Sequence, residues 1–266
     1  MKQNHFMIPY FGNKRKEVEL IYNEIKDKIN DIEFIVEPFC GSCALSYYIS
    51  LKHPNKYTYI LNDNNHQLIE LINTSKDETK MSKLKDDLLK IYDNVYNDKK
   101  KYLEVVKKAK EGDYISFVFI NKYYQIRPGI FPTEDRRSKS SLENIDKCNF
   151  LNFIRTEKTL TSNKDAVEIY DLYKNNNNTL IFLDPPYLQT CNDFYLDSSI
   201  NIYEYLFYNN IKKEKALICL CINDIWITKL LFKDIINTKS YDKTYEANGK
   251  KGEGKKKASH IIILNK

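Results

Sequence analysis

The sequence predicts an α/β protein with a largely parallel β-sheet, interrupted by a mostly helical insert. Apolar, strand-like segments alternate with amphipathic, helix-like segments through residues 15–73, and the alternation resumes near residue 159. This order is typical of a parallel sheet whose strands are connected by helices. The alternation stops over residues 74–158, of which residues 76–110 are highly charged and have apolar side chains at helical spacing. We therefore expect one discontinuous domain, 1–73 with 159–266, around an inserted domain, 74–158.

The individual elements follow from periodicity and from the residues that interrupt it. The expected helices cover residues 15–29, 43–52, 68–72, 76–110, 165–174 and 224–236. The expected strands cover residues 34–36, 57–61, 179–183, 216–222 and 258–264. The stretch 121–141, which contains prolines and arginines, has loop or hairpin character, and the lysine- and glycine-rich run 250–257 is expected to be a loop.

Composition narrows the classes of protein to which the chain can belong. Apolar residues make up 42% of its 266 residues, which is enough for a folded core. No apolar run reaches the roughly 18 residues that a membrane span needs, and the first residues do not resemble a signal peptide. We therefore expect a soluble, cytoplasmic protein that contacts no membrane. The net charge of +6 permits a polyanionic partner without requiring one.

The six cysteines predict reduced thiols rather than a metal site. Cys40 and Cys43 have a C-x-x-C spacing, but no second pair or histidine cluster accompanies them at zinc-site spacing. Cys219 and Cys221 lie two residues apart in an apolar run, which places them on one face of a strand. We expect no bound metal.

Asp184-Pro185-Pro186-Tyr187 is the motif with the clearest chemical content, and it follows an expected buried strand. Open α/β sheets bind ligands beyond the carboxyl ends of their strands. If Asp184 and the carbonyl of Pro185 accepted both hydrogens of an aromatic amino group, they would localise its lone pair toward a methyl donor. The prolines stiffen the turn, and Tyr187 could stack on an extruded base. The alternative is a Pro-Pro turn with a surface aspartate.

Two further motifs suit a bound cofactor. Glu37-Pro38-Phe39-Cys40-Gly41-Ser42 separates an expected strand from a helix, and Gly41 would let a ligand approach the backbone near the helix N-terminus. Asp63 ends the next strand, where it could accept ribose hydroxyls or instead cap the following helix. Pro9-Tyr10-Phe11-Gly12-Asn13-Lys14 offers an aromatic face, a glycine turn and a cation. These groups suit an adenine ring and a carboxylate, although in isolation the segment would be an ordinary loop.

Taken in chain order, the motifs resemble those of a known family. PYFGNKRK, EPFCGS, YILNDNNHQLIELIN and FLDPPYL are similar to the motifs of the Dam-type DNA adenine methyltransferases (D12 class, alpha group) of bacteria and phages. The likeness extends to SNKDA before the FLDPPYL strand and to the terminal ASHIIILNK, so it spans nearly the whole chain. The resemblance implies the Rossmann-like sheet of an S-adenosylmethionine-dependent methyltransferase.

The same resemblance implies roles for individual residues. Those expected to contact S-adenosylmethionine are Tyr10, Gly12, Asn13, Lys14, Pro38, Phe39, Cys40, Gly41, Ser42, Asp63, Asp165 and Asp184. Those expected to form the catalytic pocket are Asp184, Pro185, Pro186 and Tyr187. Ser42 and Cys43 stand where many relatives have further glycines, which is a departure from the family's turn.

The insert 74–158 corresponds, by the same resemblance, to a target-recognition domain whose hairpin enters the DNA. Arg127, Arg136 and Arg137 could read guanine edges or touch only phosphates. A wedge where the base leaves the stack could come from Tyr123, Tyr124 or Phe131. The expected hairpin lacks the Asn- and Gly-rich sequence that is usual in the GATC-methylating members of the family. The DNA sequence that the protein recognises therefore cannot be predicted from it.

The sequence thus predicts an enzyme that binds duplex DNA, flips one adenine and transfers methyl from S-adenosylmethionine directly to its N6, without a metal. The alternatives are RNA adenine or cytosine-N4 methylation, and a non-catalytic nucleic-acid-binding scaffold of the same fold. A dinucleotide-dependent oxidoreductase is disfavoured because G-x-G-x-x-G spacing is absent. No restriction partner or oligomeric state follows, and a homodimer is compatible with the sequence.

Overall fold

A seven-stranded sheet organises the part of the chain that this computed structural model describes, residues 6–8, 14–96, 98–124, 139–187, 202–235, 237–245 and 256–266. Its order is β3-β2-β1-β4-β5-β7-β6. The strands are β1 Phe34–Glu37, β2 Thr58–Asn62, β3 Thr159–Ser162, β4 Thr179–Leu183, β5 Leu217–Asn223, β6 Thr238–Tyr245 and β7 Lys256–Leu264. β1 to β5 are parallel, whereas β7 runs antiparallel to both β5 and β6.

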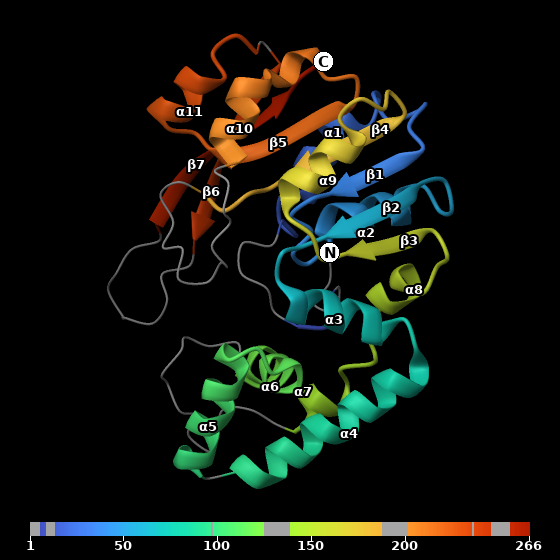
Figure 1. Cartoon of the computed structure of the whole chain (residues 1–266), viewed down its shortest axis with the longest axis vertical. Coiled ribbons are helices and arrows are strands. Elements are labelled where there is room, and N and C mark those ends of the chain that lie inside the picture. The colour runs from blue at the N-terminus through green and yellow to red at the C-terminus, as the bar shows by residue number, and fades with distance from the viewer. Residues whose placement is uncertain are drawn as a thin grey trace.

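Helices cover both faces of this sheet (Figure 1). On one face lie α1 Val18–Ile25, α2 Ala44–Lys52 and α3 His66–Ser75, and on the other α9 Ala166–Tyr173, α10 Ile202–Asn209 and α11 Trp226–Leu231. Side chains alternate between the two faces along each strand. In β1, for example, Ile35 packs on the α1–α2 side and Val36 on the α9–α10 side. Two apolar layers therefore sandwich the sheet.

The regular elements that the structure describes between β2 and β3 are all helices. It comprises α3, α4 Glu78–Val95, α5 Lys99–Lys110, α6 Tyr114–Phe119, a π-helical turn Ile120–Tyr124, α7 Ser140–Glu143 and α8 Phe150–Ile154. Figure 1 shows α4 to α7 gathered beyond α3, past the β3 edge of the sheet. The Gln67 amide in α3 donates to the carbonyls of Ala109 and Asp113, at 3.0 and 3.1 Å, and so fastens α3 to the α5–α6 junction.

Several sequence predictions need correction in their bounds. The expected helix 76–110 is two helices, α4 and α5, and the expected helices 15–29 and 224–236 are shortened to α1 and α11. β7 begins at Lys256, so the end of the expected loop 250–257 belongs to a strand, while 250–255 lie outside the described residues. The elements that were not expected are β3, β6, α6, α7, α8 and α10, and α7 begins inside the stretch 121–141 that was expected to be a loop or hairpin. Most of the expected hairpin, residues 125–138, also lies outside the described residues.

Candidate active site

Polar side chains from four strands meet at the carboxyl edge of the parallel sheet. Strand alternation places Glu37, Asp184 and His260 on the face that carries α1 and α2, because Ile35, Phe182 and Ile262, two residues away along the same strands, pack there. Asn223 at the end of β5 pairs with His260 in β7, so it shares this face. A single face at a single edge therefore collects the charged and polar groups.

Asp184 is the centre of this group. The Lys14 ammonium donates to both of its carboxylate oxygens, each at 2.5 Å, and the Tyr187 hydroxyl donates to Oδ1 at 3.1 Å. Lys14 is only 4% exposed and Asp184 17% exposed, so the ion pair is largely removed from water. Charge-assisted hydrogen bonds of this kind fix the orientation of a carboxylate. Asp184 is therefore pre-positioned with its oxygens directed toward α1.

The start of α1 holds Lys14 in place. The Lys14 carbonyl accepts the backbone N–H groups of Glu17 and Val18, at 2.9 and 2.8 Å, and so closes the turn that leads into α1. Glu17 forms a buried ion pair with Lys243 of β6. This pair anchors the first turn of α1 to the edge strand β6. It therefore also fixes the backbone from which Lys14 reaches Asp184.

Tyr187 packs into the same cluster through its ring. It is 8% exposed, and the Lys14 ammonium lies 5.0 Å from its ring centroid. The His260 ring meets it edge-on, with centroids 5.0 Å apart and planes at 75°. The Tyr203 hydroxyl of α10 donates to the carbonyl of Pro186 at 3.1 Å. The Asp-Pro-Pro-Tyr turn is thus held from both faces of the sheet.

The turn after β1 supplies the second part of the site. Gly41 and Cys43 both have left-handed backbone, with φ of 47° and 51°, and Cys43 is the N-cap of α2 without a capping hydrogen bond from its side chain. The Gly41 N–H donates to Oδ2 of Asp63 at 2.9 Å, which ties this turn to the end of β2. A glycine suits this conformation because it carries no Cβ. First-turn N–H groups of α2 consequently face the carboxyl edge.

One of the two roles expected of Asp63 was to cap α3, and the structure shows that it does not do so. Asn65 is the N-cap, because its side chain accepts the Leu68 N–H. Asp63 instead accepts the N–H groups of Gly41 and Asn65 with its two oxygens. Burial raises the pKa of the Asp63 carboxyl above its ordinary value, and these two hydrogen bonds oppose the rise.

Glu37 is the first residue of the Glu37–Ser42 motif, and no role at the site was predicted for it. Its carboxylate is 2% exposed and accepts the Ser46 N–H in the first turn of α2 at 2.7 Å. It therefore takes the place of the missing cap from Cys43. Burial raises the pKa of Glu37 to about 7, the Ser46 hydrogen bonds lower it, and the Asp184 charge adds a further rise.

Asn62 is a second residue that the sequence reasoning missed. Its amide donates to the carbonyls of Pro38 and Lys164, at 2.9 and 3.0 Å, and accepts the Lys164 N–H at 2.9 Å. It thereby joins the ends of β1, β2 and β3. Asp165 follows directly and caps α9 by accepting the Val167 N–H at 2.8 Å. Period-two alternation would have identified Asn62 and His260 as buried polar residues.

The expected site residues divide into three groups. The structure describes Lys14, Pro38, Phe39, Cys40, Gly41, Ser42, Asp63, Asp165, Asp184, Pro185, Pro186 and Tyr187, and places all of them at or directly beyond the carboxyl ends of β1 to β4 or at the start of α1. It describes only the backbone of Tyr123 and Tyr124, in the π-helical turn. Tyr10, Gly12, Asn13, Arg127, Phe131, Arg136 and Arg137 lie outside the described residues.

A surface hollow stands apart from this site, whereas two of the described cysteines, Cys40 and Cys43, lie in its turn after β1. The described cysteines are free thiols; burial raises the pKa of Cys40 and Cys43, and Cys219 and Cys221 are fully buried. Among the described residues no cluster of His, Cys, Asp and Glu is arranged to hold a metal, and no helix there is long and apolar enough to cross a bilayer.

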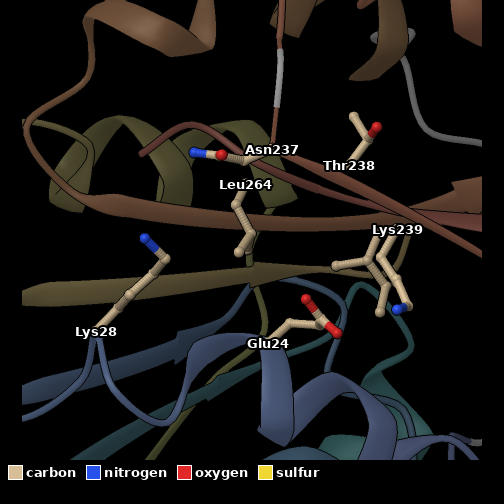
Figure 2. Close-up of a pocket in the computed structure, with 7 residues that line it drawn as sticks. Glu24, Lys28, Asn237, Thr238, Lys239 and Leu264 are labelled. Carbon is tan, nitrogen blue, oxygen red and sulfur yellow. The ribbon is translucent and has the colours of Figure 1, made fainter.

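The hollow, of about 270 Å³, lies between the end of α1 and the strands β6 and β7 (Figure 2). Glu24 reaches it from α1 and Lys28 from the turn that follows α1, and Thr238 and Leu264 line it from the strands. Leu264 pairs with Cys219 near the start of β5, so the hollow lies toward the opposite edge from Asp184. Ligands of open α/β sheets bind at the carboxyl edge, and the hollow is therefore not part of the candidate site.

The comparisons with known proteins agree with this geometry. No curated protein matches the chain. A family model described as D12 class N6 adenine-specific DNA methyltransferase matches residues 10–216, which include Lys14, the turn after β1, Asp63 and the Asp-Pro-Pro-Tyr motif. That match covers well over half of the chain, and the sheet is the Rossmann-like sheet expected of such an enzyme. The chain therefore belongs to the D12 class of N6 adenine-specific DNA methyltransferases, S-adenosylmethionine-dependent enzymes that methylate adenine at N6 at specific sites in DNA.

Proposed function

We propose that the carboxyl-edge cluster is the active centre of this methyltransferase, with the cofactor beside the turn after β1 and the target adenine against Asp184 and Tyr187. The observation that carries the proposal is Asp184, held at the end of β4 by Lys14 and by the Tyr187 hydroxyl. A buried carboxylate with fixed orientation at a strand end is suited to hydrogen bonding with a ligand.

The residues beside β1 and β2 fit S-adenosylmethionine by their chemistry. Its ribose hydroxyls need an acceptor, and Asp63 is a partly exposed carboxylate at the end of β2. Its carboxylate needs donors, which the first turn of α2 and Lys14 can supply. Its adenine needs an apolar face, and Phe39 is partly buried beside the turn. When bound, this cofactor supplies an electrophilic methyl group.

The residues of the adenine pocket would perform three tasks. Asp184 and the carbonyl of Pro185 would accept the two hydrogens of the adenine amino group, which localises its nitrogen lone pair. Tyr187 would stack on the flipped ring. The N6 nitrogen would then form a bond to the methyl carbon as the carbon–sulfur bond breaks toward sulfur, and N6 would afterwards release a proton to solvent. Positioning and electrostatic stabilisation of the cationic nitrogen account for the rate in this scheme.

We also infer that residues 74–158 form the target-recognition domain. The regular elements in the described part of this insert are helices, and α4 to α7 lie past the β3 edge of the sheet (Figure 1). The π-helical turn Ile120–Tyr124 leads directly into the stretch that carries Arg127, Arg136 and Arg137. π-Helical turns are frequent at functional sites. Because duplex DNA is the proposed substrate, we place the protein in the cytoplasm, where it has access to DNA.

The first experiment is transfer of a tritiated methyl group to mixed duplex DNA, followed by nucleoside analysis. The wild-type protein should produce N6-methyldeoxyadenosine. Asp184→Ala should lose turnover by about 10²–10³-fold, because it removes an acceptor that fixes the reacting group, yet it should still bind S-adenosylhomocysteine. Asp184→Asn serves the same comparison if loss of the Lys14 partner unfolds the alanine variant.

A matched control is Asp171→Ala, which removes an exposed carboxylate in α9 that pairs with Lys174. It should turn over normally. Normal turnover by both Asp184 variants would overturn the proposed pocket. Labelled RNA in place of DNA, or N4-methylcytosine as product, would replace the substrate assignment. Cofactor binding without any transfer would favour a nucleic-acid-binding scaffold.

A further inference from the structure

His260 is a buried histidine beside the proposed adenine pocket. It lies in β7, pairs with Asn223 of β5 on one side and Tyr241 of β6 on the other, and is 1% exposed. Its ring lies 5.4 Å from that of Tyr241 and 5.0 Å from that of Tyr187, measured between centroids. The histidine therefore stands between two tyrosines, one of which belongs to the Asp-Pro-Pro-Tyr motif.

The contact between His260 and Tyr187 helps to set how the Tyr187 ring is rotated about its long axis. The Tyr187 hydroxyl is fixed by Asp184, which leaves rotation of the ring about its long axis to be set by neighbours. Lys14 lies over the ring at 5.0 Å, and His260 meets it at 75°, in the edge-on arrangement that aromatic pairs prefer. Because His260 is only 1% exposed and its ring packs against those of Tyr187 and Tyr241, the ring has little freedom to move.

The electrostatic surroundings keep His260 uncharged. Burial lowers its pKa to about 4, and the positive charges of Lys14 and Lys243 contribute to the fall. A neutral imidazole adds no positive charge next to the Lys14–Asp184 pair, so it can support Tyr187 without weakening the hydrogen-bonding capacity of Asp184.

We infer that His260 is a positioning residue, which orients the Tyr187 ring to stack on the flipped adenine. The inference rests on the proposed function, because it assigns Tyr187 that stacking role. His260 touches neither the reacting atoms nor the cofactor in this scheme, and it acts only through Tyr187. Its removal should therefore slow methyl transfer and weaken capture of the flipped base while leaving cofactor affinity unchanged.

The test is a double-mutant cycle on duplex DNA that the wild-type protein methylates. His260→Ala and Tyr187→Ala should each lower kcat at least tenfold, and the double variant should be no slower than Tyr187→Ala alone. With 2-aminopurine at the target adenine, His260→Ala should reduce the fluorescence increase that reports flipping. S-adenosylhomocysteine affinity should change less than twofold. His260→Phe, which restores a ring edge without charge, should recover most of kcat.

The matched control is Ile262→Ala, two residues along the same face of β7 and equally buried at 1% exposure. It should lower stability to denaturant as much as His260→Ala does, but leave kcat and 2-aminopurine fluorescence unchanged. If His260→Ala fails to fold, His260→Gln enters the same cycle.

Three outcomes overturn the inference. The first is normal kcat in the His260 variants, and the second is additive losses in the double variant. The third is an equal loss of kcat in Ile262→Ala, which would show that His260 acts through stability alone. A wild-type protein that transfers no methyl group to DNA would instead overturn the proposed function, and this inference with it.

Discussion

Asn62 shows how one buried side chain can position several ligand-binding segments. Its amide carries two donors and one acceptor carbonyl, and it uses both kinds of group on the backbone of Pro38 and Lys164. Pro38 begins the turn that reaches Gly41, and Lys164 precedes the α9 cap Asp165. Three of the segments expected to surround the cofactor, those that follow β1, β2 and β3, are therefore joined by a single side chain that is itself fully buried.

Replacing Asn62 by leucine should destabilise the protein and weaken cofactor binding together. The change leaves the buried carbonyl of Pro38 and the part-buried carbonyl and N–H of Lys164 without the partner they now have, which costs about 2–4 kcal/mol of the free energy of unfolding. Urea unfolding should measure this loss, and calorimetry should show S-adenosylhomocysteine affinity reduced about tenfold. Asn163→Ala is the control, because Asn163 is exposed and makes one hydrogen bond, to the carbonyl of Asp63. Equal effects in the two variants would contradict the argument.

At this scale the sequence identified residues that end strands in recognisable motifs. Asp184, Tyr187, Gly41 and Asp63 were all predicted, and the structure places them at one edge of the sheet. Asn62 and His260 were not predicted as site residues, because a single polar residue inside an apolar strand is not by itself a recognisable motif. Their roles depend on which backbone lies beside them, and that follows only from the strand order.

Among the elements, α1 and β6 illustrate contacts that bring distant segments to the site. Glu17 is the N-cap of α1 and Lys243 lies near the end of β6, and their side chains form an ion pair that is almost fully buried. The pair fixes the start of α1 and with it Lys14. Since the partners are far apart in sequence and neither lies in a motif, the contact could not be predicted from the sequence.

Lys243→Met should cost about 3–5 kcal/mol of stability, because it leaves the Glu17 carboxylate buried without its partner. Turnover should also fall, since the start of α1 carries Lys14. The double variant Lys243→Met with Glu17→Gln should recover most of the stability, which thermal or urea unfolding would show. A double variant no more stable than Lys243→Met would mean that the two charges do not depend on each other.

The two strands that the sequence did not predict have a weak hydrophobic pattern. β3 and β6 are the two edges of the sheet, and both contain polar residues at positions that a central strand would fill with apolar ones. Edge strands pack less completely, so they need fewer apolar side chains. β4 and β5, by contrast, are buried along their whole length, and each was predicted to within one residue.

Over the whole molecule, the helical insert and the sheet share one apolar core. The cluster on the α1–α2 face runs without a break from Ile35 and Leu180 in the sheet through α3 to Leu88 in α4 and Phe119 in α6. The Lys122 ammonium, in the π-helical turn, also donates to the carbonyl of Met7 at 2.7 Å. A domain that folds alone would have a core of its own.

Unfolding should therefore be a single cooperative transition. Trp226, the only tryptophan in the sequence, is 74% exposed in α11, so near-UV circular dichroism of buried aromatic side chains such as Tyr57 and Tyr170 is used to follow the packing around the sheet. Far-UV circular dichroism reports mainly on the helices. The two midpoints should coincide in urea, and Leu88→Ala should lower both by the same amount, with a cost of about 2–5 kcal/mol. Separate midpoints would show that the insert unfolds independently.

Two buried titratable groups at the site give the molecule opposing dependences of stability on pH. Glu37 has its pKa raised to about 7 from 4.5, so the folded state holds its proton more tightly, and stability falls as pH rises through that interval. His260 has its pKa lowered to about 4 from 6.5, so the unfolded state holds its proton more tightly, and stability rises with pH through that interval. Between pH 4.5 and 6.5 the two contributions oppose each other.

Single substitutions should separate these opposing contributions. Glu37→Gln keeps an acceptor for the Ser46 N–H but cannot ionise, so its stability should rise with pH more steeply than that of the wild type, by up to about 1.4 kcal/mol per pH unit between pH 5 and 6. His260→Gln should depart from the wild type by a similar slope in the opposite direction. Urea unfolding at several pH values gives both slopes, and other titrating groups cancel because each variant is compared with the wild type. If the unfolding free energies of both variants changed with pH as that of the wild type does, neither the Glu37 carboxyl nor the His260 imidazole would have a shifted pKa. The electrostatic description of the site would then fail.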